Sequence, residues 1–258
     1  MLDPNIPSIT SYNVEMRKSM IDKIVFMDKI DAQVIVDFGC ADGSTIAFMR
    51  AIFPEIIYVG YDISVPMLEL AREKNPGVEF FSDWNILLTY LGTLAGNKAV
   101  LLNSLIHEVY SYGSPEDVDI FWKRIYDKNT FKYVVIRDMV VEESITRKSD
   151  PISVLCVKKS YDQQKLREFE TQWGSINENW ALVHFLLKYR YTRNWEREVK
   201  ENYFPISLEK LLGLIPRGWH PIDYKHYVLP FIRRQIQQDF DITLQDPTHL
   251  QLILENVG

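Results

Sequence analysis

The sequence predicts an α/β protein with a mainly parallel, doubly wound sheet of seven strands, an antiparallel pair at its C-terminal edge and an inserted helical cap. First, short apolar runs alternate with helical patterns through residues 33–140, which is typical of right-handed βαβ crossovers. Second, this alternation stops at 141–204, where charged and aromatic residues gather. Third, two strand patterns close the chain at 221–230 and 249–257, with too little chain between them for a standard crossover.

The first half of the chain supplies five strands and the helices between them. An amphipathic helix is expected over 12–30, with an apolar face formed by Val14, Ile21, Ile24, Val25 and Ile30. Five strands are expected over 33–39, 56–64, 78–84, 98–103 and 132–140, because each is a short apolar run of the kind found in buried parallel sheets. Helices are expected over 44–53, capped by Ser44, and over 65–75, 85–94 and 114–129.

The second half begins with a mostly helical segment over 141–204, whose main pieces are "LREFETQWG" and "ENWALVHFLLKYRYTRNWEREVKENYF". A helix follows in "SLEKLLGLIPRGWH", then a strand over 221–230, a short helix in "FIRRQIQQDF" and a last strand over 249–257. We therefore predict one domain formed by 1–140 and 205–258, with 141–204 inserted as a helical cap over the substrate.

Composition narrows the class of protein. The 258 residues are 47% hydrophobic, which is enough for one substantial core, and the net charge of −6 argues against broad nucleic-acid binding. The two cysteines, Cys40 and Cys156, have no metal-ligand spacing, so we expect neither a disulfide nor a metal site. No apolar run reaches the roughly 18–20 residues of a membrane span, and we expect a cytoplasmic protein with no membrane partner.

The turn "DFGCADGST" after the first strand resembles a dinucleotide-binding turn but differs in detail. The pattern G-x-G-x-x-G from Gly39 would need glycine at the positions of Ala41 and Ser44. A pyrophosphate here would also face Asp37 and Asp42, which would cost on the order of kcal/mol through like-charge repulsion. A cationic nucleoside without phosphate, such as S-adenosylmethionine, fits this turn better.

Acidic residues at the ends of the next strands fit the rest of that ligand. Asp62 ends the second strand, where a carboxylate can accept both ribose hydroxyls. Asp83 and Trp84 end the third strand, where Asp83 can accept the adenine amino group and Trp84 can stack on the ring.

Five segments in order, "VIVDFGCADGST", "VGYDIS", "FFSDW", "LLNSLIHEV" and "YVVIRDM", resemble the motifs of class I (Rossmann-like) S-adenosylmethionine-dependent methyltransferases. The resemblance covers roughly residues 33–140, and the 207–257 tail resembles that family's closing helix and β-hairpin. It implies that Asp37 and Gly39 approach the methionyl group, while Ala41 replaces the family's middle glycine. The predicted cofactor residues are Asp37, Gly39, Ala41, Gly43, Asp62, Ile63, Asp83, Trp84 and Asn103.

The end of the fourth strand, "NSLIHEVYSYG" (103–113), is the predicted place of the chemistry. It lacks the N/D-P-P-Y/F signature of amino-group methylation on DNA bases. His107 is the candidate general base, and Glu108 can orient a substrate amine or His107 itself. The alternative is that both residues only stabilise the loop. Arg137 and Asp138 either line the same cleft or form an internal ion pair.

Structural roles compete with several of these assignments. Asp37 can hydrogen-bond the turn, Asp62 can be a solvated loop residue, and Trp84 can belong to the core. Cys40 is interpreted as a packing residue because no basic residue is adjacent in sequence.

The segment "KYRYTRNWER" (188–197) interleaves basic and aromatic residues, which can stack bases and bind phosphates. A helix that packs its aromatics inward explains the same residues, and we favour that interpretation. Arg233 and Arg234 are a lesser phosphate-binding alternative on a helix that we interpret as solvated.

The predicted function is transfer of a methyl group from S-adenosylmethionine to an oxygen or nitrogen of a small or medium-sized acceptor. A nucleic-acid acceptor is open but not favoured. The alternatives are an RNA- or nucleotide-directed methyltransferase, a non-catalytic binding protein of the same fold, and a nicotinamide-dependent oxidoreductase, which the glycine spacing disfavours.

Overall fold

The computed structural model describes residues 20–258 and divides into two compact units. The sheet unit comprises the described chain up to Asp138 together with Ile215–Lys225 and Leu250–Gly258. The helical unit comprises Met139–Leu214 and His226–His249.

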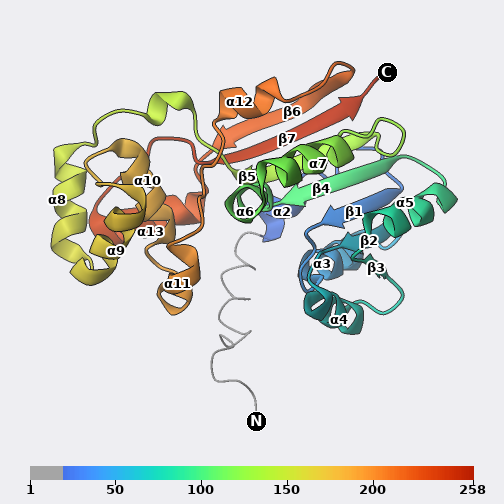
Figure 1. Cartoon of the computed structure of the whole chain (residues 1–258), viewed down its shortest axis with the longest axis horizontal. Coiled ribbons are helices and arrows are strands. Elements are labelled where there is room, and N and C mark those ends of the chain that lie inside the picture. Colours follow the sequence, from blue (N-terminus) through green and yellow to red (C-terminus); the bar gives the residue numbers. More distant parts are fainter. Residues whose placement is uncertain (1–19) are drawn as a thin grey trace, which may run out of the picture. The chain divides into compact units, whose positions relative to one another are not determined.

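Seven strands form one sheet in the order β3-β2-β1-β4-β5-β7-β6. Their bounds are β1 Val34–Phe38, β2 Ile57–Tyr61, β3 Glu79–Phe81, β4 Lys98–Asn103, β5 Tyr133–Met139, β6 Trp219–Tyr227 and β7 His249–Asn256. β1 pairs in parallel with β2 and β4, and β4 pairs in parallel with β5. β7 runs opposite to β4, and the two C-terminal strands form an antiparallel pair (Figure 1). The predicted fold class is therefore confirmed.

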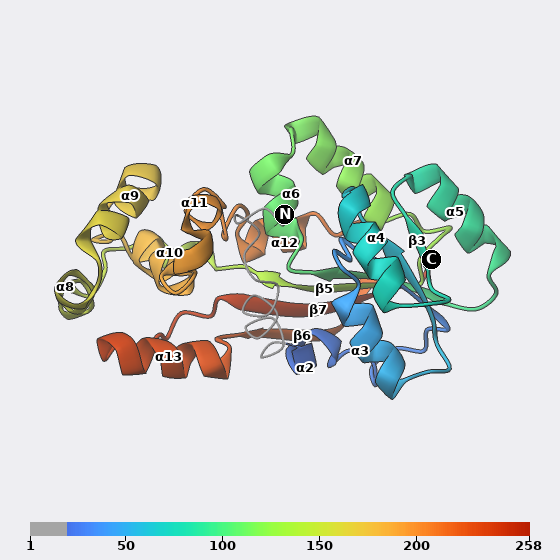
Figure 2. The ribbon, with the colours of Figure 1, turned by 90° about the horizontal axis from the view of Figure 1, so that it is seen from below.

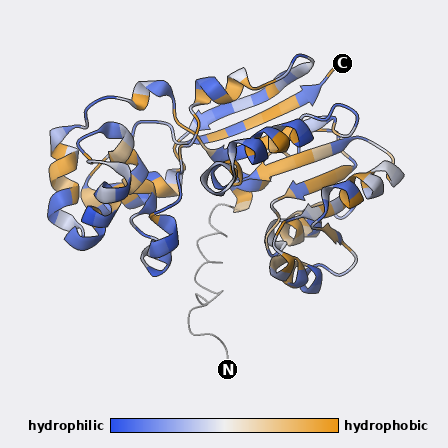
Figure 3. Cartoon of the chain, viewed as in Figure 1, coloured by the Kyte–Doolittle hydropathy of each residue, from blue (hydrophilic) through white to orange (hydrophobic). Residues whose placement is uncertain are grey.

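The central strands form because their residues are apolar on both faces. All five residues of β1 are buried, as are the four central residues of β4. Figure 3 shows both strands as hydrophobic along most of their length, whereas the edge strand β6 is mainly hydrophilic. This contrast is expected of inner parallel strands and a solvated edge.

Helices of the sheet unit cover both faces of these strands. Their bounds are α2 Met20–Ile24, α3 Ser44–Ile52, α4 Val65–Lys74, α5 Trp84–Thr93, α6 Ile106–Tyr112 and α7 Pro115–Ile125. α2 and α3 lie on one face and α7 on the other (Figure 2). The predicted start of α7 is confirmed by a capping box between Ser114 and Asp117.

The apolar face predicted for the first helix is wrong. The described helix α2 ends at Ile24, and Val14 lies outside the described residues. Ile21 is 75% exposed, whereas Lys23 is 4% exposed. The buried positions Met20, Lys23 and Phe26 follow a spacing of three, so the inward face includes a lysine that a purely apolar pattern passes over.

Two other local predictions need correction. Gly43 in the left-handed conformation, not Ser44, is the N-cap of α3, and the Asp42 side chain accepts the Ser44 amide. The segment after β4 is not an open loop, because residues 106–112 form α6.

The helical unit packs short helices around an aromatic core. Their bounds are α8 Pro151–Ser160, α9 Gln163–Trp173, α10 Asn179–Lys188, α11 Trp195–Glu198, α12 Leu208–Gly213 and α13 Pro230–Phe240. Short 3-10 turns lie at Glu143–Ile145 and Thr192–Asn194. The second of these interrupts the helical pattern predicted over 178–204. In residues 20–258, no helix combines the length and apolar character needed to cross a membrane.

Candidate functional site

The turn between β1 and α3 depends on left-handed backbone at three positions. Gly39 and Gly43 have φ of 81° and 70°, and Ala41 has φ of 46°. A Cβ at Gly39 would lie 2.6 Å from Leu105 Cδ1, and one at Gly43 would lie 2.6 Å from Asn75 Nδ2. Glycine is therefore required at both positions, while Ala41 holds the same region of conformational space at some cost.

The backbone amides of this turn are used within the chain. Gly39 and Cys40 donate to the Tyr61 carbonyl at 2.7 and 3.0 Å. Three further amides donate within the chain: that of Ala41 to Asp62 Oδ2 at 2.8 Å, that of Gly43 to the Cys40 carbonyl at 2.9 Å and that of Ser44 to Asp42 Oδ1 at 3.1 Å. A phosphate-binding turn offers such amides to its ligand. These five amides instead close the turn on itself.

The two acids of the turn have different surroundings. Asp42 forms an ion pair with Lys74 of α4, and Ser44 Oγ accepts from the same ammonium. The repulsion that the sequence assigned to Asp42 is therefore offset by Lys74. The case against a phosphate rests on Asp37 and on the internal amides.

Asp37 is a buried carboxyl group at the C-terminal end of β1. It is 2% exposed, and burial raises its pKa to about 7, with Lys23 opposing the rise and Asp62 adding to it. Among residues 20–258, no hydrogen bond reaches its carboxylate. Among these residues, Asp37 therefore does not hydrogen-bond the turn, which was the structural alternative for this residue.

Lys23 is a second buried charge in this unit, and it is not among the residues predicted from the sequence. Burial and then the Arg137 charge lower the pKa of Lys23 to about 8, against the opposing influence of Asp37, Asp138 and Asp22. Within the described part of the chain, its ammonium forms no hydrogen bond or ion pair. The available signal was a lysine at helical spacing between Met20 and Phe26.

Asp62 is held at the end of β2 by two backbone amides. Its Oδ2 accepts from Ala41 and its Oδ1 accepts from Ser64, both at 2.8 Å. Each carboxylate oxygen keeps further lone pairs for other donors. The adjacent Ile63 is 83% exposed, so an apolar surface lies beside this oriented carboxylate.

The two residues predicted to end the third strand lie at the start of α5 instead, because β3 ends at Phe81. Asp83 is exposed and caps α5, because its Oδ1 accepts the amides of Asn85 and Ile86 at 2.8 and 3.0 Å. Trp84 is 8% exposed and packs edge-on to Tyr61 with a centroid distance of 5.9 Å. The burial of Trp84 matches the core alternative.

Helix α6, which follows β4, and strand β5 bring His107 to Asp138. Asp138 Oδ1 lies 2.8 Å from His107 Nδ1, and its Oδ2 accepts the Ile106 amide at 2.6 Å. Both side chains are buried, so this carboxylate fixes the orientation of the imidazole. Asp138 is therefore a residue that positions His107.

Arg137 does not pair with Asp138. Its Nε donates to Asp22 Oδ2 at 2.7 Å and its Nη1 donates to Ser104 Oγ at 2.9 Å. Asn103, at the end of β4, has Nδ2 3.5 Å from the Lys23 carbonyl, and its buried Oδ1 has no partner among the described residues.

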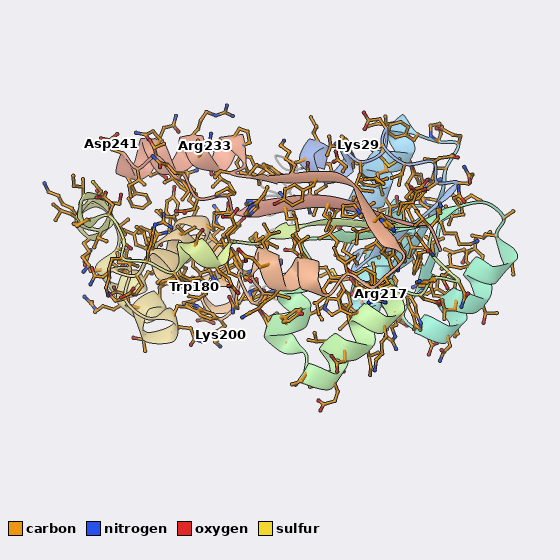
Figure 4. All side chains as sticks on the ribbon, turned by 90° about the horizontal axis from the view of Figure 1, so that it is seen from above. Lys29, Trp180, Lys200, Arg217, Arg233 and Asp241 are labelled. Atoms are coloured by element: carbon orange, nitrogen blue, oxygen red, sulfur yellow. The ribbon has the colours of Figure 1, made fainter. Side chains whose placement is uncertain are left out.

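In the helical unit, two of the three aromatic side chains of the basic-aromatic segment are buried, whereas Tyr191 is 37% exposed. Tyr189 and Trp195 are 7% and 6% exposed, and Trp195 Nε1 donates to Glu168 at 2.8 Å. Lys188 is fully buried, whereas the charged side chains of this segment were expected to point outward. Arg233 is exposed on α13 (Figure 4), as expected of a solvated helix.

Known proteins resemble this chain in structure only. No family model matches the chain, and no curated protein matches it. Among solved structures, it is similar to the methyltransferase domain of bacterial CtHen1-C, with 11% identity over 94% of this chain and 99% of that chain and a TM-score of 0.48. It is also similar to an S-adenosylmethionine-dependent methyltransferase from Archaeoglobus fulgidus, with 14% identity over 93% of each chain and a TM-score of 0.49.

A third similar structure is the plantazolicin methyltransferase BamL, in complex with a triazolic desmethylPZN analogue and S-adenosylhomocysteine. The identity is 12% over 97% of this chain and 92% of that chain, with a TM-score of 0.46. Identities and TM-scores this low carry no argument about what this chain binds or does. The fold class rests on the chain's own seven-stranded sheet, with its parallel strands and its antiparallel C-terminal pair.

Proposed function

We propose that this chain is an S-adenosylmethionine-dependent methyltransferase acting on an oxygen or nitrogen of a small or medium-sized acceptor. The observation that carries the proposal is the closed glycine turn, whose five amides donate within the chain. The turn therefore offers a ligand the carboxylates of Asp37 and Asp62 rather than a cradle of N–H donors. Carboxylates at the ends of adjacent strands suit a cationic nucleoside without phosphate.

The residues present fit this cofactor. Asp62 is oriented to accept the ribose hydroxyls, and Ile63 offers an exposed apolar surface to the adenine ring. Asp83 keeps Oδ2 for the adenine amino group, and Asp37 suits the positively charged methionyl end. When bound, S-adenosylmethionine supplies the electrophilic methyl group.

The acceptor's proton is the part of the chemistry that this chain's residues can handle. Because Asp138 binds His107 at Nδ1, Nε2 is the basic nitrogen of the neutral ring. His107 can then take a proton from an acceptor hydroxyl or amine, with Asp138 stabilising the charged imidazole. Glu108 keeps its proposed role of orienting an acceptor amine.

A small acceptor is favoured over RNA because two of the three aromatic side chains of 188–197 are buried, which leaves only Tyr191 of this segment exposed to stack on a base. Tyr189 and Trp195 are buried in the core of the helical unit. Base stacking needs open aromatic faces.

Calorimetry with S-adenosylhomocysteine and with NAD tests the cofactor assignment. We expect binding of S-adenosylhomocysteine and no binding of NAD. Binding of NAD alone, or of neither nucleotide, would overturn the proposal.

Transfer itself is tested with methyl-labelled cofactor and the small-molecule, protein and RNA fractions of a lysate. We expect label in the small-molecule fraction, and a His107→Ala variant that binds S-adenosylhomocysteine but transfers at least about a hundredfold more slowly. Label in RNA or protein would contradict the small acceptor. Absence of label from every fraction would leave the non-catalytic alternative.

A further inference from the structure

Two opposite charges are buried in the sheet unit without contacting one another. Lys23 is 4% exposed and Asp37 is 2% exposed. Among the described residues, neither charged group has a hydrogen bond, and no ion pair joins them. A buried charge without a partner is costly, so such an arrangement calls for a ligand or another compensating group.

Other buried charged groups of the same unit are paired, which makes these two distinctive. Arg137 pairs with Asp22 at 2.7 Å, and His107 pairs with Asp138 at 2.8 Å. The unit can therefore satisfy internal charges where its residues meet.

Both groups lie at the carboxyl edge of the sheet, where the strand order reverses. The chain proceeds outward from β1 to β3 and then returns to β4 beside β1, so the reversal lies between β1 and β4. Asp37 is near the end of β1, and the Lys23 carbonyl lies 3.5 Å from Nδ2 of Asn103, the last residue of β4. Ligands of open α/β sheets bind outside the strand ends at such a reversal.

An α-amino acid group carries the complementary pair of charges on one carbon atom. Its carboxylate matches an ammonium, and its ammonium matches a carboxylate. Lys23 is mostly protonated at neutral pH with its pKa of about 8, and a ligand ammonium would favour the ionised form of Asp37. Asn103 Oδ1, which is buried without a described partner, adds an acceptor for the same ammonium.

We propose that Lys23 binds the carboxylate of the cofactor's amino-acid group, while Asp37 binds its ammonium as the proposed function already assigns. This inference rests on the proposed function, since it concerns the same cofactor. It assigns Lys23 to cofactor selection by charge rather than to the stability of α2.

Three adenosine ligands separate this inference from the function itself. S-adenosylhomocysteine carries both charges, its decarboxylated analogue keeps only the ammonium, and 5′-methylthioadenosine has neither. Affinities are measured by calorimetry for the wild type, Lys23→Met and Asp37→Asn. The matched control is Lys29→Met, because Lys29 is exposed and pairs with Asp223 at 2.7 Å.

We expect the wild type to prefer S-adenosylhomocysteine to its decarboxylated analogue by at least about tenfold. Lys23→Met should remove this preference, and Asp37→Asn should weaken both amine-bearing ligands. Neither variant should change 5′-methylthioadenosine binding by more than about twofold. Thermal unfolding checks that the variants are folded.

Unchanged preference in Lys23→Met, or an equal loss for all three ligands, would overturn the inference while leaving the function standing. A wild type that binds none of the three would instead overturn the proposed function. The two failures are therefore distinguishable.

Discussion

The two units each contain a buried lysine, and the two lysines differ in what surrounds them. In the helical unit, Lys188 donates to the carbonyl groups of Glu198 and Glu201, and its nitrogen lies 4.2 Å from the Tyr203 ring centre. In the sheet unit, Lys23 has no hydrogen-bond partner among the described residues. Burial lowers the pKa of both, to about 7 for Lys188 and about 8 for Lys23.

This difference teaches that burial of a charge does not by itself identify a functional site. Lys188 has two carbonyl acceptors and an aromatic ring, so it joins α10 to the segment that follows and needs no ligand. Among the described residues, the ammonium of Lys23 has no such partners, and the carboxyl group of Asp37 has none either. We interpret the first lysine as structural and the second as part of a binding site.

The largest effect is expected from removing the structural lysine. Lys188→Ala leaves two buried carbonyl groups without their donor and creates a cavity, so the free energy of unfolding should fall by roughly 3 kcal/mol. Urea unfolding measures this change. The exposed Lys200, labelled in Figure 4, is the control, and Lys200→Ala should shift stability by less than about 0.5 kcal/mol. Equal effects of Lys188→Ala and Lys200→Ala would contradict the structural role of Lys188.

A stabilising change is expected at Asp37. Because its folded-state pKa is raised to about 7, the folded state binds the proton more tightly than the unfolded chain does, and stability falls as pH rises from about 4 to about 7. Asp37→Asn removes this cost and should stabilise the ligand-free protein by on the order of 2 kcal/mol at pH 8. The gain should vanish near pH 4. Destabilisation at pH 8 would show that Asp37 is structurally paired.

A smaller effect, on cofactor affinity, is expected to distinguish Asp62 from Asp42. Asp62→Ala should weaken S-adenosylhomocysteine binding by at least about fivefold, because it removes the acceptor proposed for the ribose and releases the Ala41 amide. Asp42→Ala is the matched control, since Asp42 pairs with Lys74, and we expect a change below about twofold. Calorimetry gives both values. A larger loss in the Asp42 variant would reverse these assignments.

The order of strands and helices could be predicted from the sequence because each inner strand is a short apolar run that ends at a turn residue. The strands predicted over 98–103 and 132–140 correspond to β4 and β5. The placement of Asp37 and Asp62 at one edge of the sheet could also be predicted, since the ends of neighbouring parallel strands meet there.

Partnerships between distant residues could not be predicted in the same way. The contact between Asp138 and His107 joins β5 to α6 across 31 positions, and Lys74 of α4 reaches Asp42 in the turn before α3. Lys23 was missed because an apolar pattern does not include a lysine on the buried face. Long-range polar contacts depend on tertiary packing, which periodicity does not encode.

The most direct test of the central claim is the proton balance of S-adenosylhomocysteine binding at pH 6.5, measured by calorimetry in buffers of different ionisation enthalpy. Asp37 faces Lys23 and Asp62, while Lys23 also faces Arg137, Asp138 and Asp22, and with its pKa of about 7 Asp37 is largely protonated at this pH. A ligand ammonium beside Asp37 lowers that pKa, so binding should release a proton, and Asp37→Asn should abolish the release. Binding without proton release, or with the same release in the variant, would contradict the assignment of this buried carboxyl group to the ligand.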